Sequence, residues 1–174
     1  MSSGTPRRLE PQALGDHVDR LYRAAWALCG DPHDAEDLVQ ETYARVLARP
    51  RFLRGSDDLG YLLRALRNVH LGRLRRLGRR VAEVSLDAAA PAGMESAAED
   101  VRMPEYALDV AELFRAIAAL PADAAHAVVA VDVVGLSYAE AASLLRIKEA
   151  TLTTRLHRAR RRVARSLETE EARL

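Results

Sequence analysis

The sequence has almost no cysteine and no long hydrophobic run. One of its 174 residues is a cysteine, Cys29, which excludes an internal disulfide and a zinc site built on cysteines. The longest apolar stretches are interrupted at His126 and Asp132, far short of the roughly 18–20 apolar residues of a membrane span, and residues 1–10 lack a secretory signal. We expect a cytoplasmic protein with no membrane insertion, no metal and no cofactor.

Signals for β-structure and for enzymatic chemistry are also lacking. There is no sustained period-two alternation and no Asn-Gly or Asp-Gly hairpin turn. We find no nucleophile–base pair and no glycine-rich phosphate loop, so a metabolic enzyme is the weakest class and no catalytic residue is assigned. Apolar residues recur instead at spacings of three and four, the pattern of amphipathic helices. The sequence therefore predicts an all-α protein that is not an enzyme.

The apolar periodicity predicts two small helical domains joined by a flexible linker. The first domain covers residues 1–80 and the second covers residues 104–174. Residues 81–103 between them lose the periodicity, are rich in alanine and acids, and carry Pro91 and Gly93, so they are expected to form the linker. The predicted helices span residues 11–29, 32–48, 57–79, 104–119, 121–134, 138–145 and 148–168.

Charged residues nearly cancel in number but are separated into blocks along the chain. Lys+Arg total 26 against 25 for Asp+Glu, which gives a net charge of +1. Residues 64–80 contain seven arginines and no acid, and residues 146–165 contain eight bases against Glu149 alone. Residues 31–41 contain five acids and no base. Because the planar guanidinium of arginine suits phosphates and guanine edges, the two basic blocks indicate surfaces that bind a nucleic acid.

The last two predicted helices and the tight turn between them form a helix-turn-helix pattern. Ser137 and Glu140 make a capping box that begins the shorter helix. An apolar stripe from Leu152 to Val163 is expected to turn one side of the long helix to the core. The opposite side would enter the major groove, where a bidentate contact of Arg158 with a guanine edge contributes about 1–3 kcal/mol of discrimination against other bases. The alternative is that this basic side is simply solvated. The residues expected to contact DNA are Thr153, Thr154, Arg155, His157, Arg158 and Arg162.

The acidic segment of the first domain predicts a helix with one acidic side. Asp37, Gln40 and Glu41 are separated by three and four residues, so they are neighbours on that helix. Such a side suits a basic partner helix, or it is simply solvated. No histidine or cysteine cluster joins these carboxylates, so they do not indicate a metal site.

Two parts of the chain resemble bacterial RNA polymerase sigma factors of the extracytoplasmic-function (ECF) branch. The run from Asp34 to Tyr43, together with Asn68 and the arginines at 73, 75 and 76, resembles the second conserved region of that family. The segments 135–142 and 155–160 resemble its fourth region, in the family's order and with a linker between. The resemblance implies an alternative sigma factor that binds core RNA polymerase and directs promoter recognition, strand opening and transcription initiation.

The resemblance also implies partners for the predicted surfaces. It places four residues of the acidic helix at the coiled coil of the largest polymerase subunit, with the flap region as a further polymerase contact: Asp37, Gln40, Glu41 and Tyr43. It places a basic loop and the third helix at the minus-ten element of promoter DNA: Arg49, Arg51, Phe52, Arg54, Arg64, Arg67 and Asn68. The exposed side of the last helix falls at the minus-thirty-five element. An anti-sigma factor is expected as a partner by resemblance alone.

Several residues depart from the family pattern. Arg146 and Lys148 stand in a turn that usually carries glycine and proline, so Arg146 must avoid the left-handed backbone conformation or accept its cost. Ala150 replaces a second usual glycine, and Thr153 replaces a commonly basic residue. These changes leave the contacts with the minus-thirty-five element open but do not alter the expected fold.

The residues themselves leave some alternatives open. Phe52 either stacks on an unpaired base or fills the small core, whereas Trp26 is expected in the core of the first domain. The whole chain is alternatively a stand-alone helix-turn-helix regulator that dimerises through its first domain, or a sigma-like protein that acts only by binding a partner.

Overall fold

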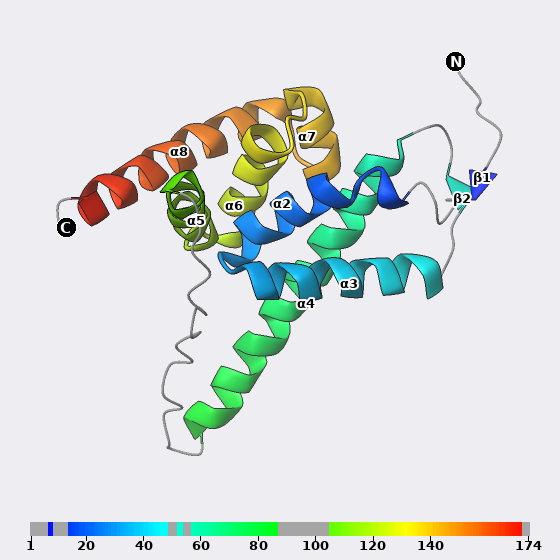
Figure 1. Cartoon of the computed structure of the whole chain (residues 1–174), viewed down its shortest axis with the longest axis horizontal. Helices are drawn as coiled ribbons and strands as arrows, with labels where there is room; N and C mark the ends of the chain where they lie inside the picture. The colour runs from blue at the N-terminus through cyan, green and yellow to red at the C-terminus, as the bar shows by residue number, and fades with distance from the viewer. Residues whose placement is uncertain (1–6, 9–13, 49–51, 54–56, 87–104, 172–174) are drawn as a thin grey trace.

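The structure is a computed structural model that describes residues 7–8, 14–48, 52–53, 57–86 and 105–171. Nearly all of the described residues are helical, which confirms the predicted all-α class (Figure 1). A two-residue antiparallel pair, β1 (Arg7–Arg8) with β2 (Phe52–Leu53), is the exception, and no β signal in the sequence predicts it. The helices are α2 (Val18–Cys29), α3 (Pro32–Ala48), α4 (Asp58–Leu86), α5 (Glu105–Ala118), α6 (Ala122–Val128), the π-helix η1 (Val129–Val133), α7 (Tyr138–Leu145) and α8 (Glu149–Glu171).

Local signals define the boundary between α2 and α3. Gly30 follows α2 in the left-handed conformation, with φ 76°, and its N–H donates to the carbonyl of Trp26 at 2.7 Å. The Asp31 carboxylate then accepts hydrogen bonds from the backbone N–H groups of His33 and Asp34, at 2.8 and 3.0 Å. Pro32 occupies the first helical position, where its missing N–H costs nothing. The predicted bounds of this helix, residues 32–48, are therefore confirmed.

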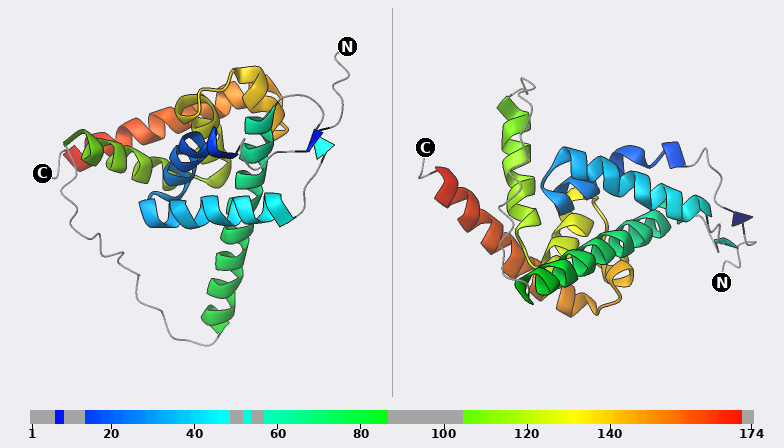
Figure 2. Two further views of the ribbon diagram at one scale, coloured as in Figure 1. Left: turned by 45° about the vertical axis from the view of Figure 1, so that its right-hand side comes forward. Right: turned by 90° about the horizontal axis from the view of Figure 1, so that it is seen from below.

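Helix α4 is longer than the sequence periodicity indicates. It continues to Leu86, so the prediction that the helix ends at residue 79 and that the linker begins at 81 was wrong for residues 81–86. The physical reason is that this segment contains neither glycine nor proline, the two residues that most strongly disfavour a helix. The C-terminal part of α4 projects away from the other helices (Figure 1 and the left view of Figure 2).

The N-terminal half (α2–α4) and the C-terminal half (α5–α8) pack directly against each other. Helix α2 contacts α5, α6 and η1, and α4 contacts α7, so that buried apolar residues of both halves form one cluster. Trp26 was expected in the core of the first domain, but it lies half-buried at this junction, edge-on to Phe114 of α5 at 5.1 Å between ring centroids. A Cβ on Gly30 would stand 3.0 Å from the Cβ of Ala118, so glycine allows α2 and α5 to approach.

The helix predicted over residues 121–134 is divided in two. After α6 the backbone widens into η1, in which the N–H of Val134 bonds to the carbonyl of Val129 at 2.9 Å. A π-turn of this kind inserts an extra residue and shifts the side chains that follow it. Gly135 then ends the segment at φ 82°.

In the turn between α7 and α8, Arg146 adopts the left-handed backbone conformation. Its φ and ψ are 57° and 46°, in the left-handed region, so this arginine accepts the cost of roughly 1–2 kcal/mol that a Cβ carries there. The N–H of Arg146 donates to the carbonyl of Ser143 at 3.2 Å and the N–H of Ile147 to that of Ala142 at 3.0 Å. These two bonds form a Schellman motif, which closes the end of α7 and sets the angle at which α8 leaves.

The described residues contain neither a candidate membrane span nor a candidate metal site. None of the helices there is long and apolar enough to cross a membrane. Nor do these residues contain a group of three or more His, Cys, Asp or Glu side chains that could hold a metal ion.

Candidate nucleic-acid and polymerase interfaces

Helix α8 has one buried side and one basic side. The predicted apolar stripe is confirmed, since Leu152 and Leu156 are 0% and 1% exposed and Ala159 and Val163 are also buried. Of the predicted DNA-contacting residues, one, Arg155, is half-buried and the others are exposed. Those exposed residues are Thr153, Thr154, His157, Arg158 and Arg162.

The two threonines of this side have their hydroxyl protons engaged within the helix. Thr153 donates to the carbonyl of Glu149 at 3.0 Å, and Thr154 donates to that of Ala150 at 3.1 Å. Each hydroxyl oxygen therefore presents its acceptor capacity outward. In the major groove such an oxygen suits the amino group of adenine or cytosine.

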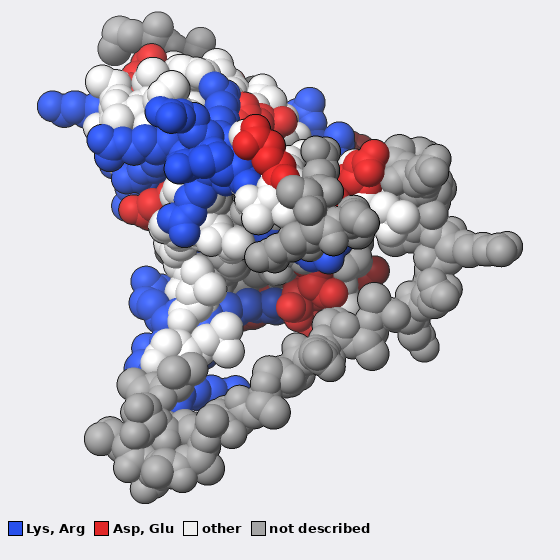
Figure 3. Space-filling view, turned by 90° about the vertical axis from the view of Figure 1, so that its left-hand side faces the viewer, with Lys and Arg blue, Asp and Glu red and all other residues white. Residues whose placement is uncertain are grey.

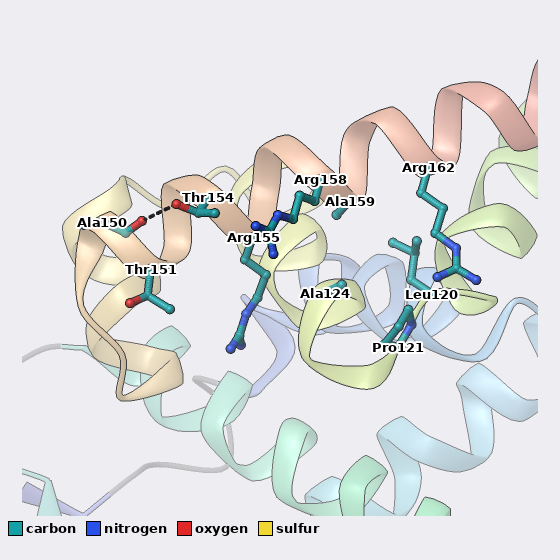
Figure 4. A pocket seen from close by; sticks show the side chains of 10 residues that line it. All are labelled: Leu120, Pro121, Ala124, Ala150, Thr151, Thr154, Arg155, Arg158, Ala159 and Arg162. Carbon is teal, nitrogen blue, oxygen red and sulfur yellow. Dashed lines mark hydrogen bonds between the residues drawn. The ribbon is translucent and has the colours of Figure 1, made fainter.

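A groove of about 630 Å³ runs beside this side of α8 (Figure 4). The Arg162 side chain of α8 extends toward Leu120 and Pro121 in the turn between α5 and α6, and Ala124 of α6 adds to the apolar surface there. Arg155 is held there by Asp123, with 3.5 Å between Nη2 and Oδ2. The groove thus combines guanidinium groups, which bind phosphates, with a small apolar patch.

Arg160 fixes α8 to the body of the C-terminal half. Its Nε and Nη2 donate to the two carboxylate oxygens of Asp132 in η1 at 3.0 and 2.6 Å. These hydrogen bonds, with a further one that the guanidinium donates to the Tyr138 side chain, raise the pKa of Arg160. The sequence analysis missed this pair because it joins residues 28 apart and depends on the π-turn, for which the sequence carries no signal.

The shorter helix of the helix-turn-helix begins with the predicted capping box. The N–H of Glu140 donates to the Ser137 hydroxyl at 3.3 Å, and the N–H of Ser137 donates to the Glu140 carboxylate at 2.8 Å. Hydrogen bonds from the Ser137 side chain and backbone lower the pKa of Glu140. The box satisfies helix N–H groups that would otherwise lack partners and so fixes where α7 begins.

The acidic side of α3 contains two kinds of residue. Asp37 and Gln40 are exposed, whereas Glu41 is half-buried. The Glu41 carboxylate lies 2.6 Å from Arg45, 2.7 Å from Arg73 and 3.5 Å from Arg76. Burial alone would raise the pKa of Glu41, but the hydrogen bonds and charges of these arginines outweigh it and lower the pKa.

Tyr43 does not lie with this acidic set. Its hydroxyl donates to the carbonyl of Leu14 at 3.1 Å, and burial raises its pKa. The side chain therefore connects α3 to the residues that precede α2.

The structure describes part of the predicted minus-ten set. On α4, Asn68 is exposed and Arg64 is half-buried, 3.9 Å from Asp57. Arg67 is half-buried, and its Nε is buried without a hydrogen-bond partner. Arg49, Arg51 and Arg54 lie outside the described residues, and so does the side chain of Phe52, whose backbone belongs to β2.

Basic side chains gather in two areas of one molecular face. Figure 3 shows the larger area over α8 and a smaller one on the projecting part of α4, with acidic side chains between them. This distribution agrees with the separated charge blocks of the sequence. The exposed residues of the two areas include Arg158, Arg161, Arg162 and Arg165 on α8 and Arg75, Arg76, Arg79 and Arg80 on α4.

A capped helix-turn-helix with a basic second helix, preceded by a helical half with an acidic side, defines a protein of the helix-turn-helix class. Residues 14–80 match Sigma-70 region 2, and residues 111–163 match Sigma-70, region 4. The chain belongs to the sigma-70 family and to its ECF branch.

Individual relatives agree with this assignment. ECF RNA polymerase sigma factor SigE of Mycolicibacterium smegmatis is 36% identical over 87% of this chain, which spans 59% of the length of that relative. ECF RNA polymerase sigma factor EcfG of Rhodopseudomonas palustris is 32% identical over 84% of this chain and 78% of its own. Among solved structures, the sigma factor RpoE in complex with the anti-sigma factor NepR from Bartonella quintana is similar, with a TM-score of 0.69 and 28% identity over 90% of this chain and 95% of that one.

Proposed function

We propose that the chain is an alternative sigma factor that binds core RNA polymerase and directs promoter recognition, strand opening and transcription initiation. The observation that carries this proposal is the presence of region 2 and region 4 of one family in a single chain, the second of which forms a capped helix-turn-helix with a basic exposed side. It acts as a specificity subunit in the cytoplasm and performs no catalysis of its own.

The exposed side of α8 is proposed to read the minus-thirty-five element. Arg158 is exposed on the same helix side as His157 and Thr154, away from the buried leucines. Arg155 and Arg162 border the adjoining groove and are suited to the phosphates that position the helix. Thr153, which stands where relatives are commonly basic, contributes an acceptor oxygen in place of a charge.

Helix α3 is proposed to bind the polymerase mainly through Asp37 and Gln40. Both side chains are exposed, so a basic partner surface can reach them without disturbing the fold. Glu41 keeps a supporting role in this proposal because its carboxylate is already shared by three arginines. Tyr43 supports the same helix from its inner side.

The minus-ten element is proposed to contact Arg64, Arg67 and Asn68 of α4, together with Arg49, Arg51, Phe52 and Arg54 of the preceding loop. Asn68 offers an amide that can bind a base edge, and the arginines offer phosphate contacts. Capture of an unpaired base by such a set assists strand opening without nucleotide hydrolysis. An anti-sigma factor is proposed as a regulatory partner, since a similar sigma factor has been solved with one.

Reconstituted transcription tests the proposed function. Core polymerase with and without the chain is supplied with genomic DNA, and the transcripts are sequenced. A set of starts that depends on the chain and shares upstream elements is expected. The absence of any dependent start would contradict the proposal, and tight sequence-specific DNA binding without polymerase would favour a stand-alone regulator.

A single arginine then tests the assignment of α8. Arg158→Ala is expected to reduce discrimination between an enriched promoter and one mutated in the minus-thirty-five element by about 5- to 140-fold, which corresponds to the loss of one bidentate base contact. Arg165→Ala removes the same charge from the exposed side of α8 about two turns away and serves as the matched control. Equal effects of the two variants on discrimination would show that Arg158 contacts only phosphates.

A further inference from the structure

Two buried histidines meet at the junction between the two halves of the protein. His70 of α4 is 6% exposed and His126 of α6 is 5% exposed. Nδ1 of His70 lies 3.3 Å from Nε2 of His126, and the ring centroids are 5.1 Å apart. This is a direct polar contact between the N-terminal half and the C-terminal half, inside a junction whose other side chains are mostly apolar.

The hydrogen bonds of the pair define the protons that the two rings carry. Nδ1 of His126 lies 2.6 Å from the carbonyl oxygen of Ala122, which can only accept, so this nitrogen carries a proton. In the neutral ring Nε2 is then bare and accepts a hydrogen bond from the protonated Nδ1 of His70. Both rings are therefore satisfied in their neutral forms.

The surroundings oppose a positive charge on either ring. A cavity of about 20 Å³ beside His126 is lined mostly by apolar side chains from both halves and by Arg67, whose Nε has no partner. Arg73 follows on α4, and the neighbouring carboxylate of Asp123 on α6 is shared with Arg155 of α8. After protonation of His126, a change of tautomer in His70 could preserve the hydrogen bond between the rings. The added charge would still be buried beside Arg67.

These features affect the two pKa values in the same direction. Burial lowers the pKa of His126 to about 4, and the charges of His70 and Arg67 add to this against the Ala122 hydrogen bond and Asp123. Burial and the charge of Arg73 also lower the pKa of His70. Because the two rings lie on opposite halves, separation of the halves would remove the part of each shift that comes from their mutual burial, while Arg73 stays beside His70 on α4.

We propose that the His70–His126 pair is a proton-sensitive latch that holds the two halves in a closed arrangement, and that protonation of the pair separates them. The biological meaning of the latch rests on the proposed function. Elements named minus-ten and minus-thirty-five are about 25 base pairs apart, or about 85 Å along B-DNA. A compact chain of this length has a radius of gyration of about 16 Å. The closed arrangement cannot occupy both elements, and it holds Arg67, a candidate minus-ten contact, inside the junction.

The sign of the pH effect follows from the lowered pKa values. In the open form the pKa of each ring rises toward the ordinary value of 6.5, so the closed form is favoured above that pH and weakens as the pH falls toward 4. His126 alone reduces the ratio of closed to open molecules by about tenfold between pH 7.5 and pH 5.5. His70 adds to the reduction.

A distance measurement on the full chain tests the latch. Fluorescent donor and acceptor are attached at exposed positions of the two halves, Ala44→Cys on α3 and Ser166→Cys on α8, in a Cys29→Ala background. Energy transfer is compared at pH 7.5 and pH 5.5. The closed-to-open ratio of the wild-type pair is expected to fall at least tenfold at the lower pH.

Histidine variants assign the response to the pair. His70→Asn with His126→Gln keeps a donor near Nδ1 and an acceptor near Nε2 but cannot be protonated, so its energy transfer is expected to be the same at both values of pH. His33→Gln removes an exposed histidine of α3 and is expected to behave as wild type. An unchanged distance in wild type, or an equal response in the double variant, overturns the latch.

A permanent charge provides an independent variant. His126→Arg, whose guanidinium stays charged when buried, is expected to be open already at pH 7.5 with unchanged helical content by circular dichroism, and a closed, fully helical His126→Arg protein would overturn the proposal. If this variant loses helix, the double variant decides. Since energy transfer requires neither polymerase nor promoter, a normal latch in a protein that initiates no transcription would count against the proposed function and not against the latch.

Discussion

The N-terminal and C-terminal halves share an apolar cluster, but each holds its helices together with a different ionic contact. In the C-terminal half, Arg160 and Asp132 form a two-residue pair that is electrically neutral. In the N-terminal half, one carboxylate, Glu41, is shared by Arg45, Arg73 and Arg76, so that the cluster keeps a net positive charge. The first contact only positions a helix, whereas the second joins α3 to α4 and leaves guanidinium groups that can still hold phosphates.

The difference shows that the role of a charged residue cannot be inferred from its position in a basic or acidic block of the sequence. Arg158 and Arg160 are both exposed on α8, yet Arg160 is bound to η1. Asp37 and Glu41 are one helical turn apart on α3, yet Glu41 is bound to α4. Within each half, residues of the same type divide into those that hold the fold and those that are available to a partner.

The largest effect is expected from the apolar cluster that the two halves share. Leu152→Ala in α8 is expected to lower the free energy of unfolding by about 2–5 kcal/mol, because Leu152 is fully buried and its truncation leaves a cavity. Leu38→Ala in α3 is expected to cost a similar amount, and both variants are expected to unfold in one transition at pH 7.5, since the cluster is continuous. Urea titration followed by circular dichroism measures this.

The control for these truncations is Leu77→Ala on the projecting part of α4, where the side chain is 56% exposed and little should change. Two separate transitions, each sensitive to only one of the truncations, would show that the closed halves do not stabilise each other through the shared cluster at this pH. The two ionic contacts would then belong to two domains that unfold separately.

A smaller effect is expected at Glu41. Glu41→Gln is expected to lower the free energy of unfolding by about 1 kcal/mol, because the partly exposed arginine pairs are individually weak. Since the pKa of Glu41 is lowered in the fold, its stabilisation is present above the ordinary carboxyl value of 4.5 and is lost as the pH falls through the folded value. The variant should therefore lose less stability than wild type on acidification below pH 4.5.

Two other carboxylates sharpen the contrast with Glu41. Asp37→Asn, at an exposed position of α3, is expected to change the free energy of unfolding by less than about 0.5 kcal/mol while weakening polymerase binding. Asp19→Asn on α2 is the matched control for the binding measurement.

Asp132→Asn is expected to loosen α8 and reduce promoter discrimination without affecting polymerase affinity. Equal stability changes in Glu41→Gln and Asp37→Asn would contradict the structural role of Glu41.

Features with a local signal could be predicted from the sequence. The Asp31-Pro32 start of α3, the glycine that ends α2, the Ser137–Glu140 box and the buried stripe of α8 each depend on residues within a few turns of one another. The resemblance to sigma factors supplied the family, which residue chemistry alone could not have separated from other helix-turn-helix proteins.

Features that join distant residues could not be predicted. Glu41 and Arg73 are 32 residues apart, and His70 and His126 are 56 apart, so neither pair leaves a periodic trace in the sequence. The same reason explains Trp26, which was assigned to one domain although its partner Phe114 belongs to the other half. The π-turn at η1 had no signal either, because its residues are valine, alanine and one aspartate, none of which distinguishes a π-turn from an ordinary helix.

A small effect of the opposite sign is expected at the turn that directs α8. Arg146→Gly is expected to raise the free energy of unfolding by a few tenths to about 1 kcal/mol, because glycine adopts φ 57° without the Cβ penalty while both Schellman hydrogen bonds stay in place. Part of the gain is offset by the greater freedom of glycine in the unfolded chain. Thermal unfolding measures the change, and Lys148→Gly, in the same turn, is the control. Promoter discrimination is expected to be unchanged, because Arg146 sets the path of the backbone and not a base contact. A loss of discrimination with a gain in stability would instead place the Arg146 side chain on the DNA.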